Sequence, residues 1–128
     1  MITFTEQEKA IILLGSSSVT AADSYVSGPN QTEEEFLDFL QRALRPTSIA
    51  YDLYDEYFDD PVKGYRQIKN ISDAKKRMIK TFFIFTCTCD GPINEGEQTA
   101  LDLLDDLCGL PYMSISEAEA EYKAFFGI

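Results

Sequence analysis

Histidine and tryptophan are absent from this chain of 128 residues, and it holds only three cysteines. Without histidine there is no imidazole general base, no Ser-His or Cys-His nucleophile pair and no histidine-ligated metal site. The P-loop, GxGxxG and GxSxG motifs are also missing from the sequence. An enzyme would have to work with carboxylates, lysine, tyrosine or cysteine. We therefore expect a protein that is not an enzyme and has no catalytic residues.

Long apolar runs are missing too. A membrane-spanning helix needs about 18 apolar residues, and the longest run, around Thr81–Cys89, is about half that length. The apolar run Ala10–Leu14 is too short for a signal peptide, and Glu6 and Glu8 precede it where a signal peptide is basic. We therefore predict a soluble protein with no membrane span.

The three cysteines are an odd number in a chain long enough to fold without disulfides. This usage fits thiols in a reducing compartment, so we predict a cytoplasmic location. Cys87 and Cys89 have the C-x-C spacing of a metal-binding pair. On a helix, however, residues two apart point about 200° away from each other, and two such side chains do not chelate one ion. The cysteines are predicted to be structural.

Positive charge is scarce: 22 acidic residues against 11 basic ones give a net charge of −11. Such a chain repels phosphate backbones, which argues against nucleic-acid binding. The partners that this charge favours are cations or the basic surface of another protein. The same charge is equally explained as a surface that keeps the protein soluble.

Signals for α-helices occur along the whole chain. We therefore predict an all-α fold of six to seven helices in one domain, residues 1–128. Capping boxes begin helices at Thr5 and Thr32, and a third box is predicted at Ser116-x-x-Glu119. The other predicted N-caps are Thr47 or Ser48, Ser72 and Asn94. The helix after Ser72 is predicted to be buried in its second half, because Phe82-Phe83-Ile84-Phe85 makes it apolar on every side. A β-strand over Thr81–Thr88 is the main alternative, since Thr, Phe and Ile favour strands.

The segment that follows Pro46 is predicted to be an amphipathic helix. Its predicted inward residues are Ile49, Leu53, Tyr54, Tyr57 and Phe58. Its predicted outward residues are Asp52, Asp55, Glu56 and Asp59.

That helix is also the predicted partner-binding segment, because it mixes aromatic and acidic side chains as binding patches do. The candidate partner-binding residues are Tyr51, Asp52, Asp55 and Asp59. In the alternative interpretation, the tyrosines pack inward and the acids form a solvated face.

The loop Asp90-Gly91-x-Ile93-x-x-x-Glu97 matches the second half of an EF-hand loop. The first half is missing, because Thr86 and Thr88 stand where carboxylates are needed. An Asp-Gly turn followed by a capping box of Asn94 and Glu97 explains the same residues without a metal.

A weak internal repeat gives this loop a counterpart. Asp23 matches Asp90, and Glu33, Leu37 and Leu40 match Glu97, Leu101 and Leu104 at identical spacing. The repeat predicts two helical hairpins packed about a pseudo-twofold axis. Pooling the two loops predicts a weak divalent-cation site, although no cofactor is required. Its candidate ligands are Asp23, Glu33, Asp90, Asn94 and Glu97.

The second half of the chain resembles the TerB-like family, small all-helical proteins named for tellurite resistance. The resemblance rests on a basic residue (Arg77), an apolar helix, the Asp90–Glu97 motif, Leu101, Leu104 and Cys108-Gly109-Leu110. It covers roughly residues 72 to 122, and the first half carries a degraded copy of the motif. It implies an all-helical fold without established catalysis, linked to stress responses, cation sensing and protein assembly.

Three hypotheses for function follow. The first is a TerB-like, stress-associated helical module that binds protein and, weakly, divalent cations. The second is a small acidic immunity or anti-defence protein that covers a basic surface on its target. The third is an enzyme that uses carboxylates.

Overall fold

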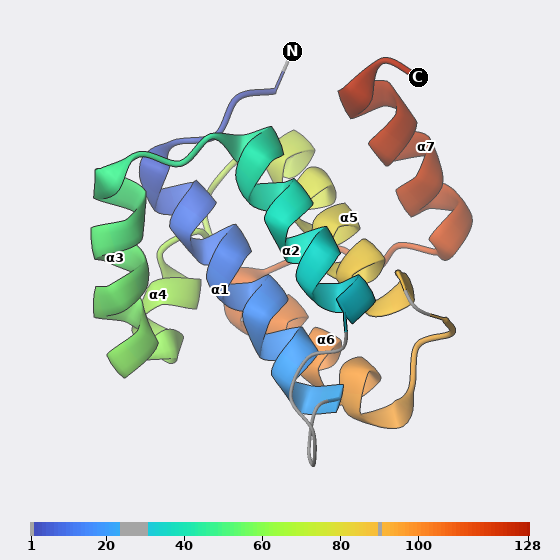
Figure 1. The fold of residues 1–128 in the computed structure, drawn as a ribbon, viewed down its shortest axis with the longest axis horizontal. Helices are drawn as coiled ribbons and strands as arrows, with labels where there is room; N and C mark the ends of the chain where they lie inside the picture. The colour runs from blue at the N-terminus through green and yellow to red at the C-terminus, as the bar shows by residue number, and fades with distance from the viewer. Residues whose placement is uncertain (1, 24–30, 90) are drawn as a thin grey trace.

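Seven α-helices make up the part of the chain that the computed structural model describes, which is all residues except 1, 24–30 and 90, and it contains no strand. Figure 1 shows their arrangement. The helices are α1 (Glu6–Asp23), α2 (Gln31–Leu44), α3 (Ser48–Asp59), α4 (Pro61–Arg66), α5 (Asp73–Thr88), α6 (Glu95–Cys108) and α7 (Ile115–Phe126). The all-α prediction is confirmed, and the predicted strand alternative is wrong because α5 runs through Thr81–Thr88.

The core lies where α1 crosses α5. Ile11, Ile12, Phe82 and Phe83 are completely buried there. The two helices approach closely at Gly15, where a Cβ atom would lie 2.4 Å from Cζ of Phe83. Because the second half of α5 is covered on nearly all sides, it can be apolar around its whole circumference, as the sequence predicted. Within the described residues, no helix has the length and apolar character needed to cross a membrane.

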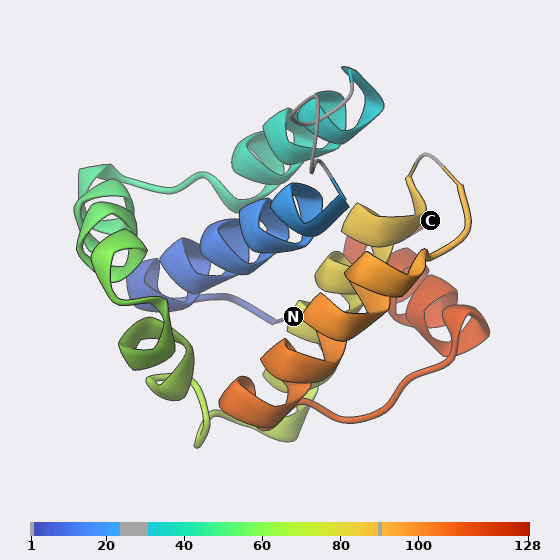
Figure 2. The same ribbon diagram turned by 90° about the horizontal axis from the view of Figure 1, so that it is seen from below.

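The helices form two similar units. In the first unit α1 packs against α2 and α3, and in the second α5 packs against α7, while α6 contacts α5 and packs mainly against α1. Figure 2 shows α1 and α5 at the centre of this arrangement, with the shorter helices outside them. Glu33 and Glu97 each occupy the third position of the second helix of their unit, and both are buried. The two predicted hairpins are therefore each extended by a third helix.

The third helix of each unit, α3 and α7, also carries a matching pattern, which lies outside the internal repeat described from the sequence. Ala50 in α3 corresponds to Ala118 in α7, and both are completely buried. The matching aromatic pairs are Tyr54 and Tyr122, Tyr57 and Phe125, and Phe58 and Phe126. The internal repeat thus spans α1–α3 and α5–α7, and α4 is the element outside it.

Most of the predicted helix ends agree with the structure. Thr5 and Glu8 form a reciprocal capping box at distances of 2.8 and 3.1 Å, as do Asn94 and Glu97 at 3.0 and 2.8 Å. The side chain of Ser72 accepts a hydrogen bond at the start of α5. These ends depend on bonds between residues three apart, which a sequence displays directly.

Two predicted capping boxes are wrong. Because α2 begins at Gln31, Thr32 is its second residue and not its N-cap. The final helix begins two residues earlier than predicted. Its capping box joins Ser114 to Glu117, at 3.1 and 3.2 Å, in place of Ser116 and Glu119.

Candidate functional site

The predicted partner-binding residues lie together on the outer side of α3. Asp52, Asp55 and Asp59 are exposed, and the side chain of Tyr51 is 42% exposed. Glu56 is exposed beside them and forms an ion pair of 3.5 Å with Lys63. Within the described residues, no ion pair neutralises the three aspartates. We refer to this exposed acidic side of the helix as the α3 face.

The α3 face contains apolar residues that the sequence interpretation placed inside. Ile49 is 60% exposed and Phe58 is 64% exposed, so the prediction that they point inward is wrong. The inward stripe instead runs through Ala50, Leu53, Tyr54 and Tyr57, with the spacing of three and four residues that defines one side of a helix. Ala50 was not among the predicted inward residues. Its spacing of three and four residues from Leu53 and Tyr54 is the signal that identifies it.

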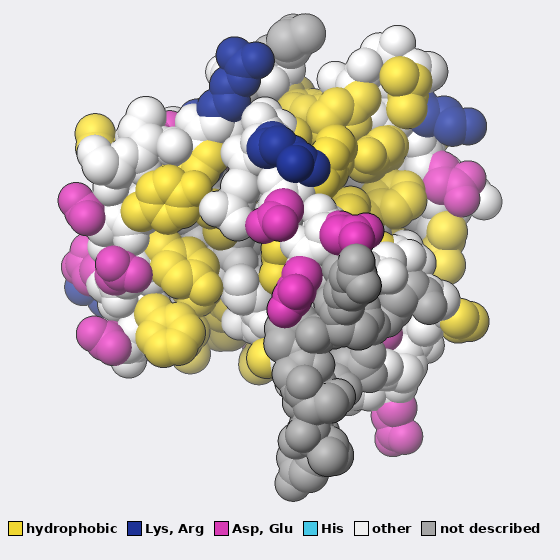
Figure 3. Space-filling view, viewed as in Figure 1, with side chains coloured by type: hydrophobic (Ala, Val, Ile, Leu, Met, Phe, Trp, Pro, Cys, Tyr) yellow, Lys and Arg dark blue, Asp and Glu magenta, His cyan; other side chains and the backbone are white. Residues whose placement is uncertain are grey.

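A groove runs beside the α3 face, between α2 and α3, with α1 as its floor. It has a volume of about 230 Å³ and is lined by Leu13, Ser17, Leu37, Gln41, Tyr51 and Tyr54. The Tyr51 hydroxyl donates to the side-chain oxygen of Gln41 at 3.0 Å, and the Tyr54 ring stacks on Phe58 with centroids 6.3 Å apart. Figure 3 shows hydrophobic side chains along this side of the molecule, with acidic side chains at the outer edge of α3.

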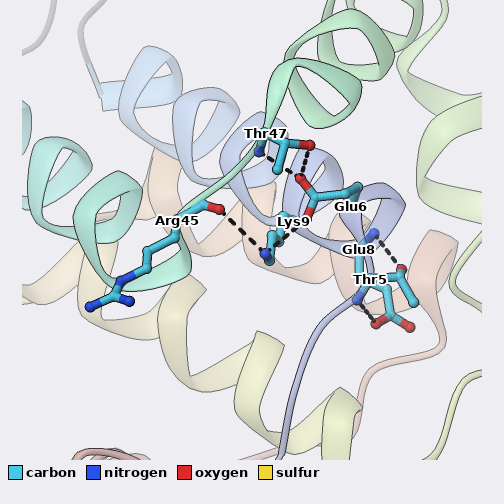
Figure 4. Close-up of polar contacts among 6 residues, drawn as sticks. All are labelled: Thr5, Glu6, Glu8, Lys9, Arg45 and Thr47. Atoms are coloured by element: carbon cyan, nitrogen blue, oxygen red, sulfur yellow. Dashed lines mark hydrogen bonds and ion pairs between the residues drawn. The ribbon is translucent and has the colours of Figure 1, made fainter.

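Contacts with α1 hold the beginning of α3 in place (Figure 4). One carboxylate oxygen of Glu6 accepts hydrogen bonds from the backbone N–H and the hydroxyl of Thr47, at 2.6 and 2.5 Å. The other oxygen lies 2.8 Å from the ammonium of Lys9. The bonds from Lys9 and Thr47 lower the pKa of Glu6 to about 2, so this carboxylate stays charged at neutral pH.

A second tie fixes the far end of α3. The amide of Gln7 donates to the hydroxyl of Tyr57 at 3.0 Å, and the ring of Tyr57 is buried against Gly64 of α4. Because both ends of α3 are held by other helices, the α3 face is a rigid surface rather than a loosely attached helix.

The predicted cation ligands are only partly within the described residues. Asp90 lies outside them, as does the side chain of Asp23. Glu33 and Glu97 are 2% and 1% exposed. Asn94 and one oxygen of Glu97 are engaged in the capping box of α6. Among the described side chains, no group of three acidic, cysteine or histidine residues is placed to hold a metal ion.

Two further polar features lie away from the α3 face. The ammonium of Lys80 is almost fully buried and lies 2.5 Å from both carboxylate oxygens of Asp105, a pair that sequence reasoning did not anticipate. Burial raises the pKa of the Cys108 thiol to about 12, which keeps it protonated at neutral pH and makes it a poor nucleophile.

Comparisons with known proteins bear on the fold alone. No family model matches the chain, and no curated protein matches it. The fold is similar to the crystal structure of a protein of unknown function from Porphyromonas gingivalis, with a TM-score of 0.74. The two sequences are 21% identical, and the match covers 97% of this chain and 99% of the other. The arrangement of helices is therefore shared with a solved protein along nearly the whole chain.

Proposed function

We propose that this chain is a non-enzymatic binding module whose α3 face docks on a basic surface of a partner protein. The observation that carries this proposal is the exposure of Ile49 and Phe58 next to the exposed carboxylates of Asp52, Asp55 and Asp59. Leaving large apolar side chains in water costs free energy, and exposed apolar side chains beside acidic ones on a rigid helix are typical of an interaction surface.

The apolar and acidic parts of the α3 face have different tasks in this proposal. The ring of Phe58 and the side chain of Ile49 lose contact with water on docking, which supplies affinity. The aspartates attract lysine and arginine side chains, which speeds the encounter and orients the partner. A partner with basic residues flanked by apolar ones fits this surface.

The α3 face suits both protein-binding roles that the sequence suggested. One is a TerB-like module in a stress-associated assembly, and the other is an immunity or anti-defence protein that covers a basic surface on its target. The exposed acidic and aromatic surface of α3 is compatible with both roles and does not distinguish them. The identity of the genes that neighbour this one would.

A capture experiment tests the proposal. The wild-type protein is immobilised, and partners are eluted and identified at about 50 mM and about 300 mM NaCl. In the test variant Asp52, Asp55 and Asp59 are changed to Lys. The matched control changes the exposed acids Glu34, Asp106 and Glu119 to Lys, which alters the net charge equally but on other helices.

We expect the partner to be retained by the wild-type protein and the control, and lost from the α3 variant and at the higher salt concentration. A Phe58→Ser variant, which keeps the charge, should also lose the partner. A partner that is retained by all variants at both salt concentrations would exclude the α3 face as its binding surface.

Weak divalent-cation binding is the second candidate function, in line with the TerB-like resemblance. The observation that favours it is that Glu33 and Glu97 occupy equivalent, buried positions in the two units. Calorimetric titration with Ca²⁺, Zn²⁺ and Mg²⁺, repeated on Asp90→Ala and Glu33→Gln, tests it. The proposal fails if no metal produces heat or shifts the melting temperature of the wild-type protein.

A further inference from the structure

A second groove lies on the side of the molecule where α2 and α7 end. It has a volume of about 460 Å³, and its walls come from the N-terminal segment, the end of α2 and the end of α7. Its apolar lining includes Phe4, Leu44, Phe125 and Phe126. The ring centroids of Phe4 and Phe125 are 6.2 Å apart, and those of Phe125 and Phe126 are 4.9 Å apart. The groove therefore has an aromatic wall in contact with the core.

The charge of this groove is opposite to that of the whole molecule. Its two charged lining residues are Lys9 and Arg45, although acidic residues outnumber basic ones two to one in the chain. The charge of Lys9 is already balanced by Glu6, at 2.8 Å. No carboxylate among the described residues pairs with Arg45. Arg45 thus contributes an unbalanced positive charge to the edge of an apolar groove. Figure 3 shows basic side chains beside the hydrophobic surface between α2 and α7.

The backbone of Arg45 is strained. Among the described residues it is the one non-glycine residue with positive φ, at 50°. Glycine or asparagine normally occupies this position after a helix, because a Cβ atom is unfavourable there. Strain of this kind persists where the surrounding structure holds it, and it often accompanies function.

Neighbouring contacts hold the strained conformation. The N–H of Arg45 donates to the Gln41 carbonyl at 3.0 Å, and the Arg45 carbonyl accepts from Lys9 at 3.4 Å. Two residues further on, Thr47 is bound by Glu6. Figure 4 shows the side chain of Arg45 directed away from these contacts, so the guanidinium takes no part in holding the backbone.

We propose that this groove binds a small amphiphilic carboxylate, with the apolar body of the ligand on the phenylalanine wall and its carboxylate on the guanidinium of Arg45. A guanidinium binds a carboxylate through two parallel hydrogen bonds, which a lysine cannot do. The groove volume lies within the range of small-ligand sites, which are mostly apolar with a few fixed polar groups. The absence of acidic lining residues removes the repulsion that such an anion meets elsewhere on this protein.

Calorimetric titration with dodecanoate below its micelle concentration tests the proposal. Acetate carries the same head without the apolar body, and dodecyltrimethylammonium carries the same body with the opposite charge. We expect heat from dodecanoate, with amide NMR shifts in the last turns of α2 and α7, and none from the other two compounds at the same concentration.

Two variants separate binding from folding. Arg45→Gly removes the charge and relieves the strain, so we expect the melting temperature to be maintained or raised while the affinity for dodecanoate falls by about tenfold or more. Ala43→Leu narrows the groove without changing charge and should also weaken binding. Arg66→Gln, on the exposed end of α4, is the control and should leave the affinity unchanged.

The proposal is overturned if dodecyltrimethylammonium binds as tightly as dodecanoate, or if Arg45→Gly keeps the wild-type affinity. It is also overturned if dodecanoate does not bind, including the case in which sedimentation shows a self-association that Arg45→Gly abolishes. In that case the groove is occupied by a second copy of this chain.

Discussion

Single side chains decide how the α3 face is presented. Glu6 connects α1 to Thr47, and Lys9 connects α1 to the Arg45 carbonyl. The same helix, α1, therefore positions both the acidic surface on α3 and the strained arginine beside the second groove. Neither connection is visible as a sequence motif, because the partners are 36 to 41 residues apart.

The stability contributed by Glu6 should depend on pH. Its pKa is lowered from 4.5 to about 2 in the folded protein, chiefly by Lys9 and then by Thr47. Because the folded pKa is below the unfolded one, this stabilisation is complete above about pH 4.5 and is lost as the pH falls towards 2. We therefore expect Glu6→Gln to lower the melting temperature at pH 7 and to have little effect near pH 2.

Thermal unfolding followed by circular dichroism between pH 2 and 7 would check this window. Glu34→Gln, which removes an exposed carboxylate of α2, is the control and should change the melting temperature little. An equal effect of Glu6→Gln at every pH would mean that the carboxylate has no special stabilising role at this junction.

At the scale of the helices, capping patterns and apolar periodicity predicted the presence of each helix better than the residue at which it begins. The chain contains two overlapping capping patterns before α7, Ser114-x-x-Glu117 and Ser116-x-x-Glu119. The structure uses the first one. When α7 begins after Ser114, its residue Ala118 is completely buried against α5. The N–H of Ala118 donates to the Ser114 carbonyl at 3.0 Å.

The two patterns make opposite predictions for mutation. Ser114→Ala removes the hydrogen bond that caps α7, so we expect it to lower the free energy of unfolding by about 1 kcal/mol. Ser116→Ala changes an exposed residue inside the helix and should alter that free energy by less than about 0.5 kcal/mol. Urea denaturation of both variants measures the difference. A larger effect from Ser116→Ala would indicate that α7 begins at the later serine in solution.

The whole molecule has a net charge of −11, and its acidic side chains are distributed over most helices. Like charges on a folded protein repel each other, and salt screens this repulsion over a distance that falls from about 30 Å at 0.01 M to about 10 Å at 0.1 M. We therefore expect the melting temperature to rise as NaCl is added over this range.

Differential scanning calorimetry in dilute buffer with increasing NaCl tests this expectation. The variant with Glu34, Asp106 and Glu119 changed to Lys is less acidic, so its melting temperature should depend less on salt. If salt lowers the melting temperature of the wild-type protein, specific ion pairs such as Lys75–Glu8, at 2.9 Å, matter more than the overall repulsion.

Much of the fold was predictable from the sequence by itself. The helical class, the buried α5 and the caps at Thr5, Ser72 and Asn94 depend on residues close together in the chain. The acidic residues of α3 were also predicted to be exposed, and they are. These features follow from helical periodicity and from hydrogen bonds within one turn, so no knowledge of distant residues is needed.

Tertiary structure alone decided which apolar residues remain outside and which charged ones are buried. Ile49 and Phe58 are exposed because α1 and α4 cover a different side of α3, and Lys80 is buried because α6 brings Asp105 to it. The positive φ of Arg45 likewise depends on contacts from α1. Each of these outcomes depends on which helices are neighbours in space. Both proposed binding surfaces include such residues, Ile49 and Phe58 on the α3 face and Arg45 in the second groove.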